Sequence, residues 1–309
     1  MTEQHPLPSG LGARTTADEA IDGIRLDGKT AIVTGGYAGI GVETTRVLAA
    51  AGARVIVPAR DVAKAKKSIG TLPNVTIESM DLAAPETVDG FAKRFGDRPL
   101  HLLVNNAGIM AVPLSRDSRG LESQLAVNHV GHFQLFSRLL PALRRAGGAR
   151  VIALSSRGHV RSAFDFDDPN FDRRPYDKML AYGQSKTANI LFAVEVDRRY
   201  RAEGIRAFAV HPGAILETDL VRHYDPEEFK LVVERARRIG SFKSVKQGAA
   251  TTIWCATSPM LEGHGGVYCE NCDVAVVKTE GDDGVRPYAV DRGNAERLWR
   301  WTESVVGVA

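Results

Sequence analysis

The stretch Thr34-Gly35-Gly36-Tyr37-Ala38-Gly39-Ile40-Gly41 follows the short apolar run Ala31–Val33 and precedes a helical stretch through Val47–Ala51. Glycines in a turn between a strand and a helix let the backbone approach a ligand closely, and the free N–H groups of the helix N-terminus attract anions. The spacing is Gly-x-x-x-Gly-x-Gly, not the common Gly-x-Gly-x-x-Gly. An ordinary turn is the alternative, but the position between the first strand and the first helix favours a dinucleotide-type turn that binds pyrophosphate.

Short apolar runs alternate with longer helical stretches along most of the chain. The predicted strands are Ala31–Val33, Val55–Val57, Val75–Ile77, Leu102–Val104, Val151–Leu154, Ala207–Val210 and Gly266–Tyr268. Several of them show no polar alternation, which is typical of parallel strands covered by helices on both faces. We therefore predict an α/β fold: a Rossmann-type, doubly wound parallel sheet of about seven strands flanked by helices.

The 309 residues contain no internal repeat, low-complexity tract or long linker, so we predict a single dinucleotide-binding domain over residues 28–309. Residues 1–27 are polar and are predicted to form an N-terminal arm. Residues 214–246 are charged and contain two candidate helices, Pro226–Phe229 and Val232–Arg238. We expect this segment to cover a substrate site.

Composition argues against several classes of protein. Forty basic and thirty-seven acidic residues give a net charge of +3, and the arginine pairs are dispersed among acids, so we expect no nucleic-acid partner. No apolar stretch approaches the ~20 residues of a membrane span, and we expect no membrane anchor. The three cysteines (Cys255, Cys269 and Cys272) suit a reducing compartment, so we expect the protein to be cytoplasmic.

Two features resemble metal sites only in part. Cys269-Glu270-Asn271-Cys272 is accompanied by no second cysteine pair or suitably spaced histidine, which favours two incidental thiols. His129 and His132 have no carboxylate or cysteine at metal-ligand spacing, so we predict that they pack in the interior or lie at the surface. The sequence therefore predicts no metal centre.

The second predicted strand leads into Pro58-Ala59-Arg60-Asp61. In dinucleotide sites an acid at the end of this strand binds the ribose 2′-hydroxyl, whereas a nearby arginine accommodates a 2′-phosphate. Ala59 is uncharged and Arg60 supplies the cation, so we predict NADP(H) in preference to NAD(H). A surface role for Arg60 is the alternative, and Asp61 is predicted to cap the next helix.

Polar and small residues follow other predicted strands at their carboxyl ends, where open α/β sheets bind ligands. They are Asp81 and Leu82 after the third strand, Asn105, Asn106, Ala107 and Gly108 after the fourth, Ser155 and Ser156 after the fifth, and Pro212 and Gly213 after the sixth. Asp81 either contacts an adenine edge or caps the helix from Pro85. Asn105–Gly108 either admits a planar ligand or stabilises a loop, and Ser156 is either a helix cap or part of the ligand edge.

The motif Tyr182-Gly183-Gln184-Ser185-Lys186 lies on a predicted amphipathic helix. Residues four apart share a helix face, so Tyr182 and Lys186 should point into the same space. An ammonium beside a phenol favours the phenolate and brings acid–base chemistry nearer neutral pH, while a solvated pair is the alternative. Asn128 lies on a helix predicted over Leu121–Leu143 and is either a buried structural amide or a further site residue.

These motifs together resemble those of the short-chain dehydrogenase/reductase family between about Gly28 and Ala275. In the family's order they are Thr34–Gly41, Asp81, Asn105–Gly108, Asn128, Ser156, Tyr182 with Lys186, and Pro212-Gly213. The likeness is greatest to the branch that contains retinol dehydrogenases and WW-domain oxidoreductases. It is carried by Val127–Phe133, Ala181–Leu191, Lys243–Thr252 and the long spacing from Ser156 to Tyr182.

The resemblance implies an NADP(H)-dependent oxidoreductase that transfers hydride between the nicotinamide and a small-molecule carbonyl or alcohol. It implies that Tyr182 is the acid/base and that Lys186 holds the nicotinamide ribose and lowers the pKa of Tyr182. It implies that Ser156 bonds the reacting oxygen and that Asn128 holds a water in a proton relay. The implied cofactor-binding residues are Gly35, Tyr37, Ala38, Gly39, Ile40, Gly41, Arg60, Asp81, Leu82, Asn105, Ala107, Gly108, Tyr182, Lys186, Pro212, Gly213, Ile215 and Thr218.

The chain departs from the family pattern after Pro212-Gly213. Family members place a threonine shortly after this pair to touch the nicotinamide carboxamide, but here Glu217 precedes Thr218 as if one residue were inserted. Either residue is a candidate for that contact. The family often pairs subunits through the helices that carry Asn128 and Tyr182, so we expect a homo-oligomer. A catalytically silent NADP-binding regulator of the same fold is the alternative, although such proteins typically lose the tyrosine or the lysine.

Overall fold

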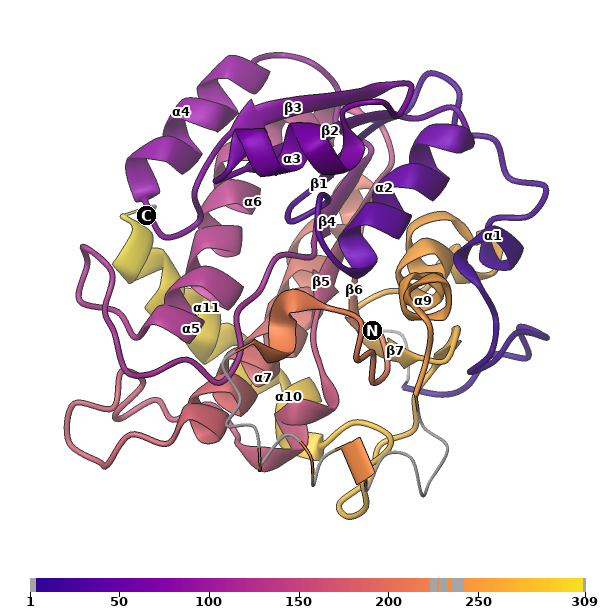
Figure 1. The fold of residues 1–309 in the computed structure, drawn as a ribbon. Coiled ribbons are helices and arrows are strands. Elements are labelled where there is room, and N and C mark those ends of the chain that lie inside the picture. Colours follow the sequence, from indigo (N-terminus) through magenta and orange to yellow (C-terminus); the bar gives the residue numbers. More distant parts are fainter. Residues whose placement is uncertain (1–3, 223–226, 228–229, 231–232, 235–241, 308–309) are drawn as a thin grey trace.

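A single eight-stranded sheet runs through the described part of the chain in the order β3-β2-β1-β4-β5-β6-β7-β8 (Figure 1). The computed structural model describes residues 4–222, 227, 230, 233–234 and 242–307. The strands are β1 (Thr30–Val33), β2 (Arg54–Ala59), β3 (Val75–Ser79), β4 (Leu102–Asn105), β5 (Ala149–Leu154), β6 (Ile205–His211), β7 (Val267–Glu270) and β8 (Asp273–Val274). All neighbouring pairs are parallel except β7 with β8.

The strand order confirms the predicted doubly wound α/β fold. β1 pairs with β2 on one side and with β4 on the other, so the direction of winding reverses between β1 and β4. At such a reversal the loops leaving the two strands diverge, and a crevice opens at the carboxyl ends of the strands. The glycine-rich stretch leaves β1 at this point.

The sheet has one strand more than the sequence predicts, because β7 turns directly into the short antiparallel β8. Asn271 and Cys272 occupy the turn with φ angles of 55° and 59°. Two residues of positive φ make the tight hairpin turn that suits the twist of antiparallel strands, and asparagine tolerates this conformation. The Cys-x-x-Cys spacing therefore reflects a hairpin.

Helices cover both faces of the sheet (Figure 1). One face carries α2 (Ile40–Ala50), α3 (Val62–Ile69) and α9 (Val245–Thr257), and the other carries α4 (Pro85–Phe95), α6 (Gly131–Arg145) and α7 (Lys178–Tyr200). The remaining α-helices of the described chain are short or lie outside these layers: α1 (Ala17–Ala20), α5 (Ser123–Leu125), α10 (Pro287–Val290) and α11 (Arg292–Val306).

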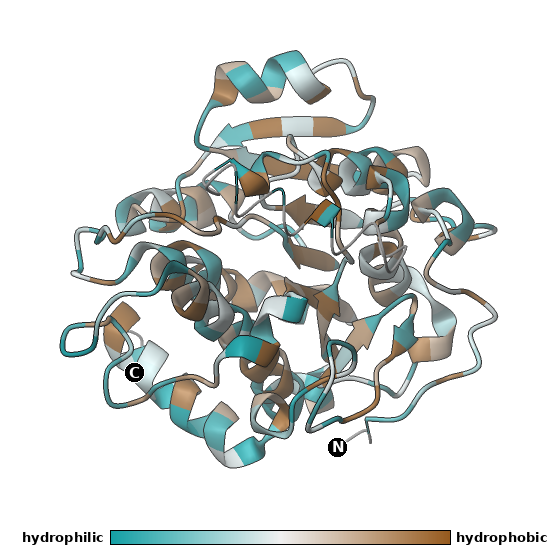
Figure 2. Cartoon of the chain, turned by 60° about the horizontal axis from the view of Figure 1, so that its bottom comes forward, coloured by the Kyte–Doolittle hydropathy of each residue, from teal (hydrophilic) through white to brown (hydrophobic). Residues whose placement is uncertain are grey.

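Alternate residues of each strand enter opposite cores. Ile32 and Leu103 pack with α4 and α6, whereas Val33 and Val104 pack with α2 and α9. Both sets are fully buried, which explains why the strand sequences show no polar alternation. Figure 2 shows this arrangement as hydrophobic strands at the centre of the molecule and hydrophilic colour on the outer surfaces of the helices.

The segment predicted as an N-terminal arm packs against the fold. Thr16 begins α1 with a capping box that pairs it with Glu19, and α1 lies against α9. The Gln4 side-chain amide donates to the carbonyls of Tyr268 and Ala275 at 2.6 Å each and accepts from the Tyr268 N–H at 3.0 Å. Arg14 donates to the Phe242 carbonyl at 2.8 Å. The arm therefore joins β7 to the base of the segment 214–246.

The candidate helices Pro226–Phe229 and Val232–Arg238 fall largely outside the described residues, so their prediction is not tested here. None of the described helices combines the length and apolar character needed to cross a lipid bilayer.

Candidate active site

The loop between β1 and α2 has a conformation that glycine alone adopts without strain. Gly35 and Gly39 have φ angles of +62° and +52°. A Cβ atom at Gly41 would lie 2.2 Å from the Gly35 carbonyl oxygen, so the loop closes tightly on itself. Asn106 holds it from the neighbouring strand, because its side-chain amide donates to the Thr34 carbonyl at 2.8 Å.

The N-terminus of α2 faces this loop without a side-chain cap. Gly39 occupies the cap position and has no side chain to satisfy the N–H groups of the first turn. Uncapped N–H groups and the positive end of the helix dipole make an anion site. Tyr37, Ala38 and Ile40 belong to the same turn and lie partly buried beside it. The loop therefore fits a pyrophosphate.

The segment after β6 crosses the glycine loop. Ile215 packs against α9, where a Cβ atom at Gly248 would meet its side chain at 2.8 Å. A Cβ atom at Gly39 would lie 3.1 Å from the Thr218 methyl group, whereas Glu217 is exposed. Of the two candidates for the carboxamide contact, Thr218 is thus the residue that borders the loop.

An ion pair ties the same segment to α3. Asp219 accepts from Lys64 at 2.7 Å, one residue beyond Thr218. Asp61 caps α3 by accepting from the Lys64 N–H at 2.8 Å, which confirms its predicted role. Arg60 lies exposed directly after β2 and precedes this cap.

Tyr182 and Lys186 lie one turn apart on α7, and both are buried. The Lys186 ammonium lies 5.5 Å from the centroid of the Tyr182 ring. It donates to the Leu154 carbonyl at the end of β5 at 2.9 Å. Burial lowers the pKa of Lys186 to about 7, because the charged form loses its hydration. These observations place an ammonium of adjustable charge beside a phenol.

Asn128 lies in a π-helical turn, η1 (Ala126–Val130), between α5 and α6. The sequence predicts one continuous α-helix here. The structure differs in that this turn is wider and contains one residue more than an α-helical turn. The Asn128 amide accepts from the Ile109 N–H at 2.9 Å and donates to the Ile109 carbonyl at 3.0 Å and to Ser185 Oγ at 2.9 Å. A π turn inside a helix is commonly found at functional sites.

Ser156 approaches Tyr182 across Gly158. A Cβ atom at Gly158 would lie 2.7 Å from the Tyr182 ring and 3.4 Å from Ser156 Oγ, so a larger residue at this position would push the ring aside. Ser156 Oγ accepts from the Gly158 N–H at 3.0 Å and so caps a short 3₁₀ turn, Arg157–Arg161. The predicted cap role and the predicted site role are thus compatible.

A second glycine connects Asn128 with Lys186. A Cβ atom at Gly108 would lie 3.2 Å from Asn128 Oδ1 and 3.4 Å from Lys186 Nζ. Ala107 borders the glycine loop, where a Cβ atom at Gly35 would lie 3.0 Å from its Cα. The residues after β4 therefore lie next to the glycine loop at Ala107 and next to Lys186 at Gly108.

The other predicted cofactor residues lie along the same edge. Asp81 accepts from the Ala83 N–H at 2.9 Å, so one carboxylate oxygen holds the local turn, and Leu82 is buried beneath it. Asn105 is buried, and its amide makes no hydrogen bond among the described residues. Gly213 has a φ of +98° and follows Pro212 after β6. Arg60 follows β2, which β1 and β4 separate from β5 in the sheet.

Four residues support the site although the sequence assigns them no catalytic or cofactor role. Asn106 holds the glycine loop, Ser185 bonds Asn128, and Gly158 accommodates the Tyr182 ring. Ser155 donates to the Lys186 backbone carbonyl at 2.9 Å and so fastens α7 to β5. Asn106, Ser155 and Ser185 are adjacent in sequence to predicted site residues, whereas Gly158 lies two residues after Ser156 and carries no sequence signal of its own.

The cysteines and histidines do not form a metal centre in the described part of the chain. Cys255, Cys269 and Cys272 are free and buried. His129 is buried and hydrogen-bonded to Thr302 at 3.0 Å, and His132 is buried and hydrogen-bonded to Thr34 at 2.8 Å.

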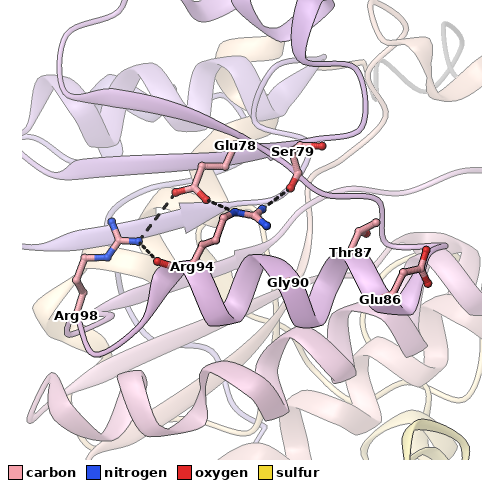
Figure 3. A pocket seen from close by; sticks show the side chains of 7 residues that line it. All are labelled: Glu78, Ser79, Glu86, Thr87, Gly90, Arg94 and Arg98. Atoms are coloured by element: carbon pink, nitrogen blue, oxygen red, sulfur yellow. Dashed lines mark hydrogen bonds and ion pairs between the residues drawn. The ribbon is translucent and has the colours of Figure 1, made fainter.

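A groove of about 800 Å³ lies between the edge strand β3 and α4 (Figure 3), and β2, β1 and β4 separate β3 from β5, which leads to Ser156. Arg94 crosses it to donate to the Ser79 carbonyl at 2.8 Å and to face Glu78 at 3.5 Å. The acidic and basic side chains that line the groove neutralise one another, and the groove contains none of the predicted site residues.

The sequence profile of the short chain dehydrogenases matches residues 29–228. The chain belongs to the short-chain dehydrogenase/reductase family. Membership in this family implies an oxidoreductase that uses NAD(P)(H). The match begins directly before β1 and includes the glycine loop, Asn128, Ser156, Tyr182 and Lys186.

Individual relatives extend this short-chain dehydrogenase similarity over nearly the whole chain. A protein of Streptomyces antibioticus named "probable oxidoreductase" is 43% identical, covering 89% of this chain and 97% of its own length. Retinol dehydrogenase 12 of Mus musculus is 35% identical, covering 92% of this chain and 88% of its own length. The crystal structure of an uncharacterized protein from Mycobacterium paratuberculosis superposes with a TM-score of 0.75 at 32% identity, covering 93% of this chain and 97% of that one.

Proposed function

We propose that this short-chain dehydrogenase transfers hydride between NADP(H) and a small carbonyl or alcohol, with Tyr182 as the acid/base. The observation that carries the proposal is that four polar side chains come together beside two glycines. Tyr182 and Ser156 meet at Gly158, and Lys186 and Asn128 meet at Gly108. The four polar groups thus face one space at the carboxyl ends of β4 and β5.

The glycine loop and the edge beyond it fit a dinucleotide. The uncapped N-terminus of α2 offers N–H groups to a pyrophosphate, and the positive φ angles of Gly35 and Gly39 keep side chains out of its path. Thr218 borders the loop, and the buried Asn105 amide leaves donors and an acceptor unused. When bound, the nicotinamide would supply or accept the hydride.

The residues of the protein then have two tasks, which are to transfer one proton and to stabilise one developing negative charge. During reduction Tyr182 gives its phenolic proton to the substrate oxygen, and Ser156 donates a hydrogen bond to the same oxygen as its negative charge develops. Lys186, when charged, favours the Tyr182 phenolate that results. Asn128 holds the chain at Ile109 and α7 at Ser185, so its amide fixes the distance between the two walls of the site.

A panel of aldehydes, ketones and alcohols, followed by the absorbance of NADPH, tests the proposal. Turnover of any member would exclude the silent NADP-binding regulator. Absence of turnover over the whole panel, with NADP bound normally in calorimetry, would favour the regulator. The presence of Asn128, Ser156, Tyr182 and Lys186 in one site supports the enzyme, since a regulator has no need of them.

Arg60→Ala is expected to raise the KM for NADPH by roughly ten- to a hundredfold, the worth of a charge-assisted hydrogen bond to phosphate. The KM for NADH should change by no more than about twofold, because NADH lacks the 2′-phosphate. Arg54→Ala is the matched control, since Arg54 is an exposed arginine at the other end of β2. Equal use of NADH and NADPH, together with no effect of Arg60→Ala, would refute the NADP preference.

Binding of NADP is expected to take up a proton at pH 8. Burial lowers the pKa of Lys186 to about 7, so the amine is mostly neutral at this pH. Hydrogen bonds from the ammonium to ribose hydroxyls favour the charged form and raise this pKa. The complex then binds more protons than the free protein above pH 7, and affinity falls as pH rises through that range.

Calorimetry in two buffers of different ionisation enthalpy measures the proton uptake. Lys186→Met should abolish it, while Lys66→Met, a change of an exposed lysine on α3, should leave it unaltered. Identical heats in both buffers for the natural protein would contradict the assigned role of Lys186.

A further inference from the structure

Next to Ser156, five polar residues gather at the carboxyl ends of three neighbouring strands. Arg157 follows Ser156 after β5, His211 ends β6, and Glu270 ends β7. Tyr268 lies on β7, and Lys243 lies over Gly213, where a Cβ atom would meet its side chain at 2.6 Å. We call these five residues the Arg157 cluster.

The Arg157 backbone N–H donates to His211 Nδ1 at 3.3 Å, so the ends of β5 and β6 lie together, and the charge of Arg157 acts on three other members. Burial lowers the pKa of His211, and the charges of Arg157 and Lys243 lower it further. Burial raises the pKa of Glu270, and the same two cations oppose that rise. Burial also raises the pKa of Tyr268, which lies within electrostatic reach of both Arg157 and Tyr182. Arg157 directly precedes Gly158, where a Cβ atom would lie 2.7 Å from the Tyr182 ring, so the cluster begins next to the phenol.

Several donors of the cluster lack acceptors among the described residues. Within the described chain, the fully buried Tyr268 hydroxyl makes no hydrogen bond. Neither the Arg157 guanidinium nor the Lys243 ammonium forms an ion pair with any residue that the structure describes, although Lys243 is only 9% exposed. A buried donor without an acceptor costs free energy, so natural proteins usually retain one where a ligand or water completes it.

The acceptors nearby are already engaged. Glu270 accepts from the Gly284 N–H at 2.9 Å. His211 Nδ1 faces the N–H groups of Arg157 at 3.3 Å and Gly213 at 3.4 Å, which requires a neutral ring with Nδ1 unprotonated. Asp283, close to Glu270, is paired with Lys278. Two cations thus face a single carboxylate, and the cluster has an excess of positive charge and of donors.

We propose that Arg157, assisted by Lys243 and the Tyr268 hydroxyl, binds an anionic group of the substrate, so that the preferred substrates are oxo acids or hydroxy acids. The acid group would occupy the Arg157 cluster while the carbonyl lies at Tyr182 and Ser156. This inference rests on the proposed function for the reaction and adds the substrate class. Charge-assisted bonds to a guanidinium in a partly buried site are specific for carboxylate and phosphate geometry.

The test compares two aldehydes that differ in one charge, 4-carboxybenzaldehyde and 4-formylbenzamide. We expect kcat/KM to favour the acid by roughly ten- to a hundredfold at low salt, and this preference to shrink as salt is added. Arg157→Ala should remove the preference by lowering kcat/KM for the acid alone. Glu270→Gln should increase it, because a competing negative charge is lost.

Arg161→Ala is the matched control, an exposed arginine of the same 3₁₀ turn, and should leave the preference unchanged. Equal kcat/KM for the two aldehydes, or an equal loss on both in Arg157→Ala, would overturn the proposal. Binding of terephthalate and of terephthalamide, measured by calorimetry with NADP present, makes the same comparison without turnover. Tighter binding of terephthalate by a protein that reduces no aldehyde would support the anion subsite and refute the proposed reaction, while equal binding would refute the subsite.

Discussion

Replacing Tyr182 with phenylalanine is expected to lower kcat by at least about a hundredfold, the lower end of what general acid–base catalysis contributes. The change removes the phenolic proton and leaves the ring, which is buried against Gly158. Because the ring still fills its place, the Kd for NADP should change by no more than about twofold. Single-turnover kinetics and calorimetry measure the two quantities separately.

Tyr200→Phe is the control for this substitution. Tyr200 ends the same helix, α7, and its ring contacts Phe136 and Trp299 at centroid distances of 5.7 Å and 6.1 Å, far along the helix from Tyr182. The same atom is removed, and kcat should be unaltered. If Tyr182→Phe retained near-normal turnover while remaining folded, another group would have to supply the proton, and the assignment of Tyr182 would fail.

The sequence predicts the sheet well because its strands are buried on both faces. Runs such as Val55–Val57 and Leu102–Val104 lack polar residues for that reason, and the alternation with helices then sets the parallel order. The tyrosine and lysine are predictable as a pair because helix geometry alone brings residues four apart to one face. Local periodicity is thus enough for these features.

Features that depend on contacts between distant segments of the chain cannot be predicted from local periodicity. Asn128 lies in a π turn within a helix, where its amide bonds Ile109 and Ser185, and no local sequence pattern predicts such a turn. Thr218 borders Gly39 only because the segment after β6 folds across the loop. The short strand β8 depends on the positive φ angles of Asn271 and Cys272, which the sequence prediction did not include.

The position of α11 is the largest of these differences. No pattern in the sequence indicates where this helix packs, and the structure lays it against α7 and η1 (Figure 1). Trp299 inserts among aromatic rings of α6 and α7, 4.7 Å from Phe133 and 6.2 Å from Phe192 between centroids. Thr302 bonds His129 on η1. Pairing of subunits through the helices of Asn128 and Tyr182 stays a prediction, and α11 occupies part of the surface of these helices.

Trp299→Ala is therefore expected to lower the free energy of unfolding by about 3–5 kcal/mol, the usual cost of removing a buried large aromatic side chain. Trp299 is only 3% exposed, and the Arg199 guanidinium lies 4.7 Å from its ring centroid, so truncation opens a cavity and removes a cation–π contact. Trp301→Ala, on the same helix but half-buried against Phe164, should cost roughly 1 kcal/mol. Urea unfolding followed by circular dichroism measures both. Equal and small losses for the two variants would show that α11 does not seal α7, and would leave the faces of α6 and α7 available to a second subunit.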